Sequence, residues 1–110
     1  MYNLFKAFLF LFDPEVIHRL TILFLKLIPL NKTFIPKELN TKIFGINFSS
    51  PIGLAAGFDK NAEVYSKRFN LGFGFVEVGT VTPKPQEGNS RPRIHRIKKE
   101  RAIINSLGFN

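Results

Sequence analysis

Apolar residues fill the first thirty positions of the chain, and one short polar segment interrupts them. Leu, Ile and Phe dominate residues 1–30, but Asp13-Pro14-Glu15 divides the run in two. Asp is favoured just before a helix, Pro suits the first helical position, and Glu is stabilised at the positive end of the helix dipole. The pattern therefore predicts helices over residues 2–12 and 14–28, the second ending before Pro29.

Neither helix resembles a membrane span or a cleaved leader. A span needs about 20 uninterrupted apolar residues, and no small-residue cleavage motif follows the apolar run. The second helix carries an apolar stripe at helical spacing, formed by Ile17, Leu20, Phe24, Leu27 and Ile28. The sequence predicts a helical hairpin that either lies on a membrane surface or packs on its own domain, and the pattern leaves both interpretations open.

The pattern of apolar and polar residues changes after a polar linker at residues 31–42. Short β-like runs follow, separated by Gly, Pro and Asn, and one helix-like run lies between them. The expected strands cover two pieces of 42–48 around Gly45, then 51–56, 73–78, 93–97 and 101–104; the expected helix covers 62–70, with Val64 and Phe69 on its buried face.

Strand, loop, helix and strand in this order predict a parallel pair joined by a right-handed crossover. Functional residues collect at the carboxyl ends of parallel strands, which here are residues 56–60 and Gly79-Thr80. Gly57 allows backbone to approach a flat ligand, and Lys60 supplies positive charge for an anionic one. Thr80 and Asn105 offer polar groups that can bind a heterocycle. A turn glycine and a solvated lysine explain the same residues, so the spacing alone leaves their role open.

Composition narrows the chemistry further. The net charge is +8, there is no cysteine, and His18 and His95 are the only histidines. These counts exclude thiol catalysis and zinc–thiolate sites and predict no metal site. A basic cluster could indicate nucleic acid, but it lacks interleaved aromatic residues and spans a hairpin whose charges are expected to face water, so we expect no nucleic-acid partner. Its members are Arg91, Arg93, Arg96, Lys98, Lys99 and Arg101.

Several long motifs resemble the class 2, quinone-dependent dihydroorotate dehydrogenases. Residues 51–61, PIGLAAGFDKN, are similar to that family's first barrel strand and flavin loop, and 71–89, LGFGFVEVGTVTPKPQEGN, to its second strand and following loop. Residues 91–96, RPRIHR, and 103–110, IINSLGFN, continue the match, and 13–20, DPEVIHRL, resemble its second N-terminal helix. The resemblance implies an α/β fold in which the helical hairpin (1–30) and linker (31–42) precede the first two βα units of a (β/α)8 barrel (43–110).

The resemblance also implies a reaction and its site. Dihydroorotate is oxidised to orotate, FMN accepts the hydride, and a membrane quinone reoxidises the flavin, in pyrimidine biosynthesis. Matching positions assign FMN contacts to Ala56, Gly57, Phe58, Asp59, Lys60 and Thr80. Substrate contacts fall on Lys60, Asn105, Ser106, Leu107, Gly108 and Phe109, and the quinone tunnel on His18 and Arg96.

Length limits what these residues can do alone. A (β/α)8 barrel takes about 250 residues, so the family's serine base and most FMN contacts are expected beyond Asn110. We therefore expect the 110-residue polypeptide alone to be inactive, within an enzyme associated peripherally with the inner face of a bacterial cytoplasmic membrane. The alternative is a non-catalytic lipid-surface or partner-binding module that carries a barrel remnant.

Overall fold

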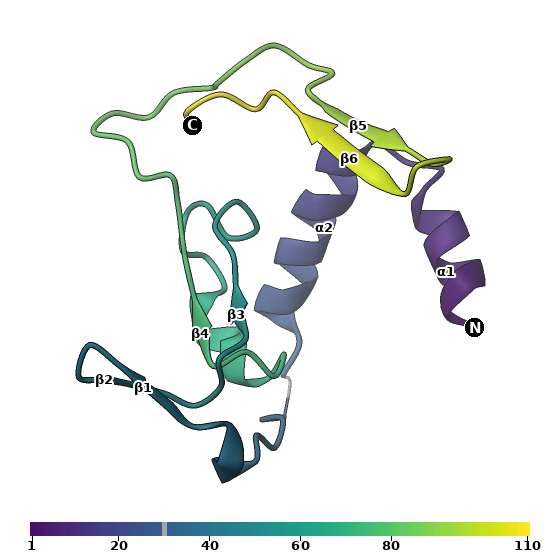
Figure 1. The fold of residues 1–110 in the computed structure, drawn as a ribbon. Helices are drawn as coiled ribbons and strands as arrows, with labels where there is room; N and C mark the ends of the chain where they lie inside the picture. The colour runs from purple at the N-terminus through teal and green to yellow at the C-terminus, as the bar shows by residue number, and fades with distance from the viewer. Residues whose placement is uncertain (30) are drawn as a thin grey trace. The chain divides into compact units, whose positions relative to one another are not determined.

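The structure is a computed structural model that describes residues 1–29 and 31–110, without the side chains of Arg68 and Phe69. Its contacts define two compact units. The first contains Met1–Thr21 and Thr82–Asn110, and the second contains Ile22–Val81. Figure 1 shows the elements of both units along the chain. Each unit is described by itself.

The two N-terminal helices are confirmed, with α1 over Tyr2–Leu9 and α2 over Pro14–Leu27. Asp13 caps α2, because its Oδ1 accepts hydrogen bonds from the backbone N–H groups of Glu15 (2.9 Å) and Val16 (3.1 Å). The first helix ends three residues earlier than predicted. The Leu11 N–H donates to the Phe8 oxygen (3.1 Å). This i→i−3 bond tightens the turn between the end of α1 and Asp13, the N-cap of α2.

A β-hairpin is the first strand pair of the second unit. It follows the 3-10 helix η1 (Lys37–Leu39) and pairs β1 (Thr41–Ile43) with β2 (Ile46–Phe48) in antiparallel register. Phe44 and Gly45 form the turn with φ angles of 50° and 81°. Two consecutive positive φ angles suit the right-handed twist of a two-residue hairpin, which explains the predicted break at Gly45.

The predicted parallel pair is present as β3 (Gly53–Leu54) and β4 (Phe75–Val76) (Figure 1). Hydrogen bonds extend this ladder on both sides, from Gly74 N–H to the Ile52 oxygen (2.9 Å) and from Glu77 N–H to the Leu54 oxygen (2.9 Å). Gly74 permits the pairing, because a Cβ there would overlap the backbone of buried Ser50. The parallel pair is therefore confirmed, but each strand has two residues and is shorter than the run that the sequence predicts.

The helix predicted over 62–70 is wrong in its first part. A 3-10 helix, η2, covers only Tyr65–Phe69. Ala62 has a φ of 55°, which ends regular helical geometry, and the Asp59 carboxylate accepts the N–H groups of Glu63 (2.7 Å) and Val64 (2.8 Å). The side chain competes with the backbone for these donors, so the segment closes as a turn.

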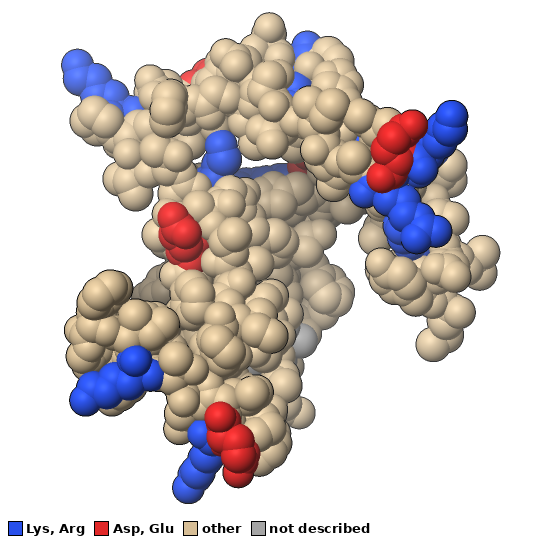
Figure 2. Space-filling view, in the orientation of Figure 1, with Lys and Arg blue, Asp and Glu red and all other residues tan. Residues whose placement is uncertain are grey.

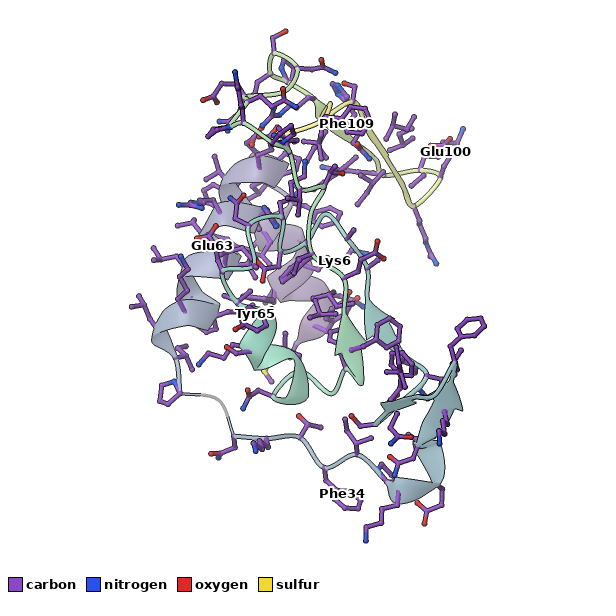
Figure 3. All side chains as sticks on the ribbon, turned by 90° about the vertical axis from the view of Figure 1, so that its left-hand side faces the viewer. Lys6, Phe34, Glu63, Tyr65, Glu100 and Phe109 are labelled. Atoms are coloured by element: carbon purple, nitrogen blue, oxygen red, sulfur yellow. The ribbon has the colours of Figure 1, made fainter. Side chains whose placement is uncertain are left out.

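A small apolar cluster stabilises the second unit. Ile22 and Leu25 of α2 are buried with Val64, and Phe58 packs against them. The predicted burial of Val64 is confirmed, whereas the side chain of Phe69 lies outside the described residues. Lys26 of α2 forms an ion pair with Glu63, which Figure 3 labels beside Tyr65. These contacts join α2 to the segment that connects β3 with β4.

The first unit contains an antiparallel pair close to the positions predicted. It joins β5 (Ile94–Ile97) to β6 (Ala102–Asn105), with His95 opposite Ile104. Every residue of β6 is exposed. In residues 1–29 and 31–110 the strands form three separate pairs and no closed barrel, so the fold is a mixed helix–strand arrangement.

In the part of the chain that the structure describes, neither α1 nor α2 nor any other helix has the length and hydropathy that crossing a membrane requires.

Candidate functional site

The predicted flavin loop and Thr80 lie at the same ends of the paired strands. The Gly57 N–H donates to the Gly79 oxygen (3.2 Å), so the segments that leave β3 and β4 meet beside the loop. Ala56 and Thr80 are exposed, and Gly57 has a φ of 97° with open space where a Cβ would stand. Small residues and an open backbone surface suit a flat ligand. Lys60, half-buried, follows two residues after Phe58 in this loop.

Asp59 occupies a different position in that loop. It is 2% exposed, and its two carboxylate oxygens each accept a backbone N–H, from Glu63 and Val64. Both oxygens of the Asp59 carboxylate are therefore bonded to the backbone. These bonds fix the shape of the loop that contains Lys60. The contact to FMN expected from the family pattern remains a prediction for Asp59.

The predicted substrate segment, Asn105 to Phe109, lies in the first unit and is held by neighbouring loops. The Ser106 N–H donates to the Arg93 oxygen (2.9 Å), and the Ser106 oxygen accepts from Asn89 Nδ2 (2.7 Å). The Asn89 N–H donates to the Leu107 oxygen (3.0 Å). Gly108 has a φ of 73° and lies against Asn89. Phe109 is exposed, labelled at the top of Figure 3.

Arg93 organises this segment. Its guanidinium donates to the backbone oxygens of Glu87 (2.6 Å) and Asn89 (3.0 Å), and it holds the Glu15 carboxylate through two bonds of 2.8 and 3.1 Å. A forked guanidinium that satisfies four acceptors fixes them in one plane. Arg93 thereby ties the first turn of α2 to the loop that supports Ser106.

The charge pair changes the acidity of Glu15. The hydrogen bond from Arg93 holds the pKa of the Glu15 carboxyl below its usual value, against an opposing effect of desolvation. The same bond raises the pKa of Arg93. Arg91 adds a weaker contact to Glu15 at 3.0 Å, because its own side chain is 68% exposed. The bond from Arg93 therefore favours the ionised form of the Glu15 carboxyl.

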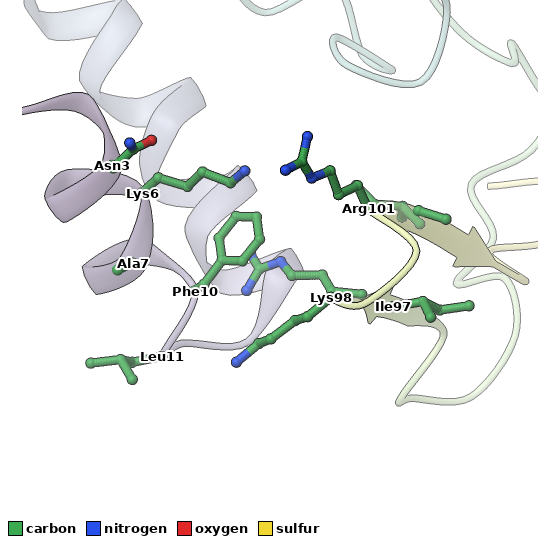
Figure 4. Close-up of a pocket in the computed structure, with 11 residues that line it drawn as sticks. Asn3, Lys6, Ala7, Phe10, Leu11, Ile97, Lys98 and Arg101 are labelled. Atoms are coloured by element: carbon green, nitrogen blue, oxygen red, sulfur yellow. The ribbon is translucent and has the colours of Figure 1, made fainter.

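A cavity of about 670 Å³ lies in the first unit beside Arg96 (Figure 4). The Arg96 guanidinium lies 4.4 Å from the centre of the Phe10 ring and donates to the Phe12 oxygen at 2.9 Å. The Lys6 ammonium lies 5.3 Å from the same ring. The walls of the cavity come from α1, the turn after α1 and the β5–β6 hairpin. The lining residues are Asn3, Lys6, Ala7, Phe10, Leu11, Arg96, Ile97, Lys98, Arg101, Ala102 and Ile103.

The two residues predicted for the quinone tunnel thus occupy different surroundings. Arg96 lines the cavity, whereas half-buried His18 lies on α2 and is not one of the lining residues. The flavin loop and Thr80 are brought together in the second unit, and the substrate segment is built in the first.

Comparison with known proteins identifies the group. A sequence model described as dihydroorotate dehydrogenase matches residues 38–110. The chain belongs to the dihydroorotate dehydrogenase family. Among its curated relatives is a dihydroorotate dehydrogenase (quinone) from Chelativorans sp. (strain BNC1), 55% identical over 110 residues, which cover 98% of this chain and 30% of the relative. Another, from Rhodopseudomonas palustris (strain TIE-1), is 57% identical over 102 residues, covering 89% of this chain and 27% of the relative.

A solved structure supports the same assignment. The crystal structure of dihydroorotate dehydrogenase from Eimeria tenella in complex with ferulenol has a TM-score of 0.81 and 50% sequence identity; the match covers 89% of this chain and 27% of that one. The family resemblance of the sequence is therefore confirmed. The chain spans about 30% of the length of the curated relatives it matches. Dihydroorotate dehydrogenases are flavoenzymes, which is consistent with the open loop at Gly57.

Sequence reasoning missed the pairing of Glu15 with Arg93. Glu15 was interpreted as a helix-dipole residue, and Arg93 as one of several solvated charges on a hairpin. The second interpretation is wrong for Arg93, which is 8% exposed. No local signal marks Arg93 as buried, because the alternation of β5 puts it on the same face as exposed His95.

Proposed function

We propose that this chain forms part of an enzyme that oxidises dihydroorotate to orotate, with FMN as hydride acceptor and a membrane quinone as final acceptor, in pyrimidine biosynthesis. The observation that carries the proposal is the parallel pair β3–β4, whose carboxyl ends place the loop of Gly57 beside Gly79-Thr80. Strand ends of this kind are where barrel enzymes hold their ligands. The family membership supplies the reaction class.

The residues of the loop fit FMN in shape and charge. Gly57 leaves open space against the backbone, where an isoalloxazine ring can lie flat. FMN supplies a ring that accepts a hydride from the substrate. Lys60 provides a positive charge that stabilises anionic groups of the flavin and of dihydroorotate. Thr80 provides a hydroxyl, and Ala56 and Phe58 border the same loop. Asp59 keeps the loop in this shape through its two backbone bonds.

The segment Asn105–Phe109 is the proposed wall of the orotate site. Asn105 carries an amide that can donate to and accept from a pyrimidine edge. Arg93 and Asn89 fix the backbone of Ser106 and Leu107, so the segment is preorganised before a ligand arrives. Gly108 allows the chain to pass close to Asn89. Preorganisation lowers the entropy cost of binding and keeps Asn105 in the position from which it can bind the ligand.

The cavity beside Arg96 is the proposed quinone site. Its apolar walls suit a hydrophobic ring, and the Arg96 guanidinium can donate to a quinone oxygen. His18 is the second polar residue assigned to this path by the family pattern. Residues 1–30 form the membrane-facing part, 31–42 a linker and 43–110 the flavin part in this proposal. Peripheral attachment at the inner face of the cytoplasmic membrane delivers the quinone.

The test uses the protein expressed from its complete reading frame. We expect bound FMN and dihydroorotate-dependent reduction of a quinone analogue, and we expect Lys60→Ala to lower kcat/KM by at least 100-fold, a loss in the range for removing a positioned charge. Lys37→Ala, at an exposed lysine of η1, is the matched control and should retain activity. Absence of both FMN and dihydroorotate oxidation in the unmodified protein refutes the assignment.

A second measurement uses a polypeptide confined to residues 1–110. We expect no turnover from it, because the serine base and most of the FMN contacts are assigned to positions beyond Asn110. Clear dihydroorotate-dependent quinone reduction by this polypeptide would contradict that assignment. Stable folding with vesicle binding and no flavin would instead favour the non-catalytic lipid-surface module.

A further inference from the structure

Glu15 and Arg93 form a largely buried ion pair that none of the proposed ligand contacts includes. Their side chains are 13% and 9% exposed, and Arg93 Nε lies 2.8 Å from Glu15 Oε1. Several Lys and Arg side chains in Figure 2 extend outward from the surface, as solvated charges do. Two charges withdrawn from water gain little net stability, because the cost of desolvation offsets their attraction. A buried pair of this kind points to a geometric role, which the other contacts of Arg93 define.

The guanidinium of Arg93 also holds the loop that precedes it in the chain. It donates to the backbone oxygens of Glu87 (2.6 Å) and Asn89 (3.0 Å). Gly88 lies between these two residues in close contact with its surroundings, because a Cβ there would stand 2.3 Å from the Leu107 oxygen and 2.9 Å from the Arg93 guanidinium. The loop is therefore held between the side chain of Arg93 and the backbone of Leu107.

This loop in turn fixes the proposed wall of the orotate site. Asn89 donates from Nδ2 to the Ser106 oxygen (2.7 Å) and from its backbone N–H to the Leu107 oxygen (3.0 Å). The Arg93 oxygen accepts the Ser106 N–H at 2.9 Å. Asn105 is the last residue of β6, directly precedes these bonds and is exposed. The amide of Asn105 therefore takes its position from a backbone that Arg93 and Asn89 hold.

We propose that Glu15 and Arg93 are positioning residues of the dihydroorotate site, acting through the loop of Asn89 to hold Asn105 in the orientation that binds the substrate. Four of the five N–H groups of Arg93 donate to protein acceptors, so the side chain acts through the protein. Glu15 belongs to the first turn of α2, so this helix contributes to the dihydroorotate half of the reaction. The inference rests on the substrate site proposed above and adds two residues that support it.

The test uses the protein expressed from its complete reading frame. Isothermal titration calorimetry gives the dissociation constant of orotate, and steady-state kinetics give kcat and the KM values for dihydroorotate and for a quinone analogue. Glu15→Gln removes the charge of the pair, and Glu38→Gln, at an exposed residue of η1, is its matched control. Arg93→Lys keeps the charge and removes the fork. Its matched control is Arg91→Lys, at an exposed arginine that also contacts Glu15.

We expect Glu15→Gln to raise the orotate dissociation constant and the dihydroorotate KM by about 3- to 10-fold, because apparent affinity falls with the population of the binding-competent segment. Its kcat and its KM for the quinone should change by less than about 2-fold, since the interaction lost is one of substrate binding. Its FMN content should stay the same. Arg93→Lys should raise the same two constants at least as much, because one ammonium cannot reach every acceptor that the guanidinium holds. Both controls should match the unmodified protein.

Three results overturn the proposal. The first is unchanged orotate affinity and dihydroorotate KM in Glu15→Gln. The second is an equal rise in Glu15→Gln and Glu38→Gln, which shows that net charge is responsible. The third is a loss of FMN and kcat at unchanged dihydroorotate KM, which identifies a pair that only stabilises the fold. If Arg93→Lys does not accumulate as a flavoprotein, Glu15→Gln and its control decide. Absence of FMN and of dihydroorotate oxidation in the unmodified protein is a separate result, which refutes the proposed function itself.

Discussion

Replacing Glu15 by Gln should loosen the segment that supports the proposed substrate site. The carboxylate accepts two bonds from Arg93, at 2.8 and 3.1 Å, and its side chain is only 13% exposed. Gln keeps one oxygen acceptor but loses the charge. The expected effect appears first in the loop around Asn89 and in Ser106, which Arg93 holds.

The size of the effect follows from the bonds that change. A hydrogen bond to a charged group contributes about 1.5–3 kcal/mol. Gln loses one such bond to Arg93 and weakens the other, while the exposed contact to Arg91 adds less than about 1 kcal/mol. We therefore expect a local destabilisation of about 2 kcal/mol, or about 30-fold in the opening equilibrium.

Native-state hydrogen exchange measures this opening directly. The N–H groups of Asn89 and Ser106 are both hydrogen-bonded, to the Leu107 and Arg93 oxygens, so their exchange reports when the segment opens. Peptides covering residues 85–110 should exchange about 30-fold faster in Glu15→Gln, a factor set by the energy above. Glu38→Gln, at an exposed residue of η1, is the matched control. Unchanged exchange in the variant, or the same change in the control, refutes the reasoning.

The pH dependence gives the same pair a second signature. Because the hydrogen bond from Arg93 lowers the pKa of Glu15, the folded state binds its proton more weakly than the unfolded state. The resulting stability is present above the pKa of the unfolded carboxyl and is lost as the pH falls through the lower pKa of the folded one. Exchange of the Ser106 amide, corrected for its intrinsic rate, should accelerate on acidification in the unmodified protein and much less in Glu15→Gln.

Three further changes test the fold and the loop. Gly74→Ala should lower stability by about 1–3 kcal/mol or more, because the new Cβ meets the backbone of Ser50; a thermal melt that matches the unmodified protein argues against this close approach. Leu25→Ala should lower the free energy of unfolding by about 2–3 kcal/mol, at the low end for a buried leucine because the cluster is small. Urea unfolding, monitored by hydrogen exchange in residues 22–64, measures this loss. Asp59→Asn should reduce FMN affinity by about 10-fold, as it weakens one of two charge-assisted bonds that shape the loop at Val64; flavin titration with unchanged affinity would show that the loop holds its shape without the carboxylate.

Local patterns in the sequence were sufficient for the elements that depend on neighbouring residues. Asp13-Pro14-Glu15 predicted the start of α2, and the structure confirms the cap through the bonds to Asp13 Oδ1. Short β-like runs predicted strands close to β5 and β6, and the order strand, loop, helix, strand predicted the parallel pair β3–β4. Caps, turns and strand alternation are set within a few residues, so one sequence contains the information.

The tertiary structure decided what joins residues far apart in the chain. The Asp59 carboxylate closes the turn at Val64, and the helix expected over 62–70 is shortened to Tyr65–Phe69. Arg93 and Glu15 are separated by 78 positions, and no local pattern indicates that they meet. The cavity needs α1 and the β5–β6 turn together. Such contacts depend on how distant segments pack, and periodicity and composition do not encode this packing. The family motifs, in contrast, lie in contiguous stretches, so the sequence alone was sufficient to identify them.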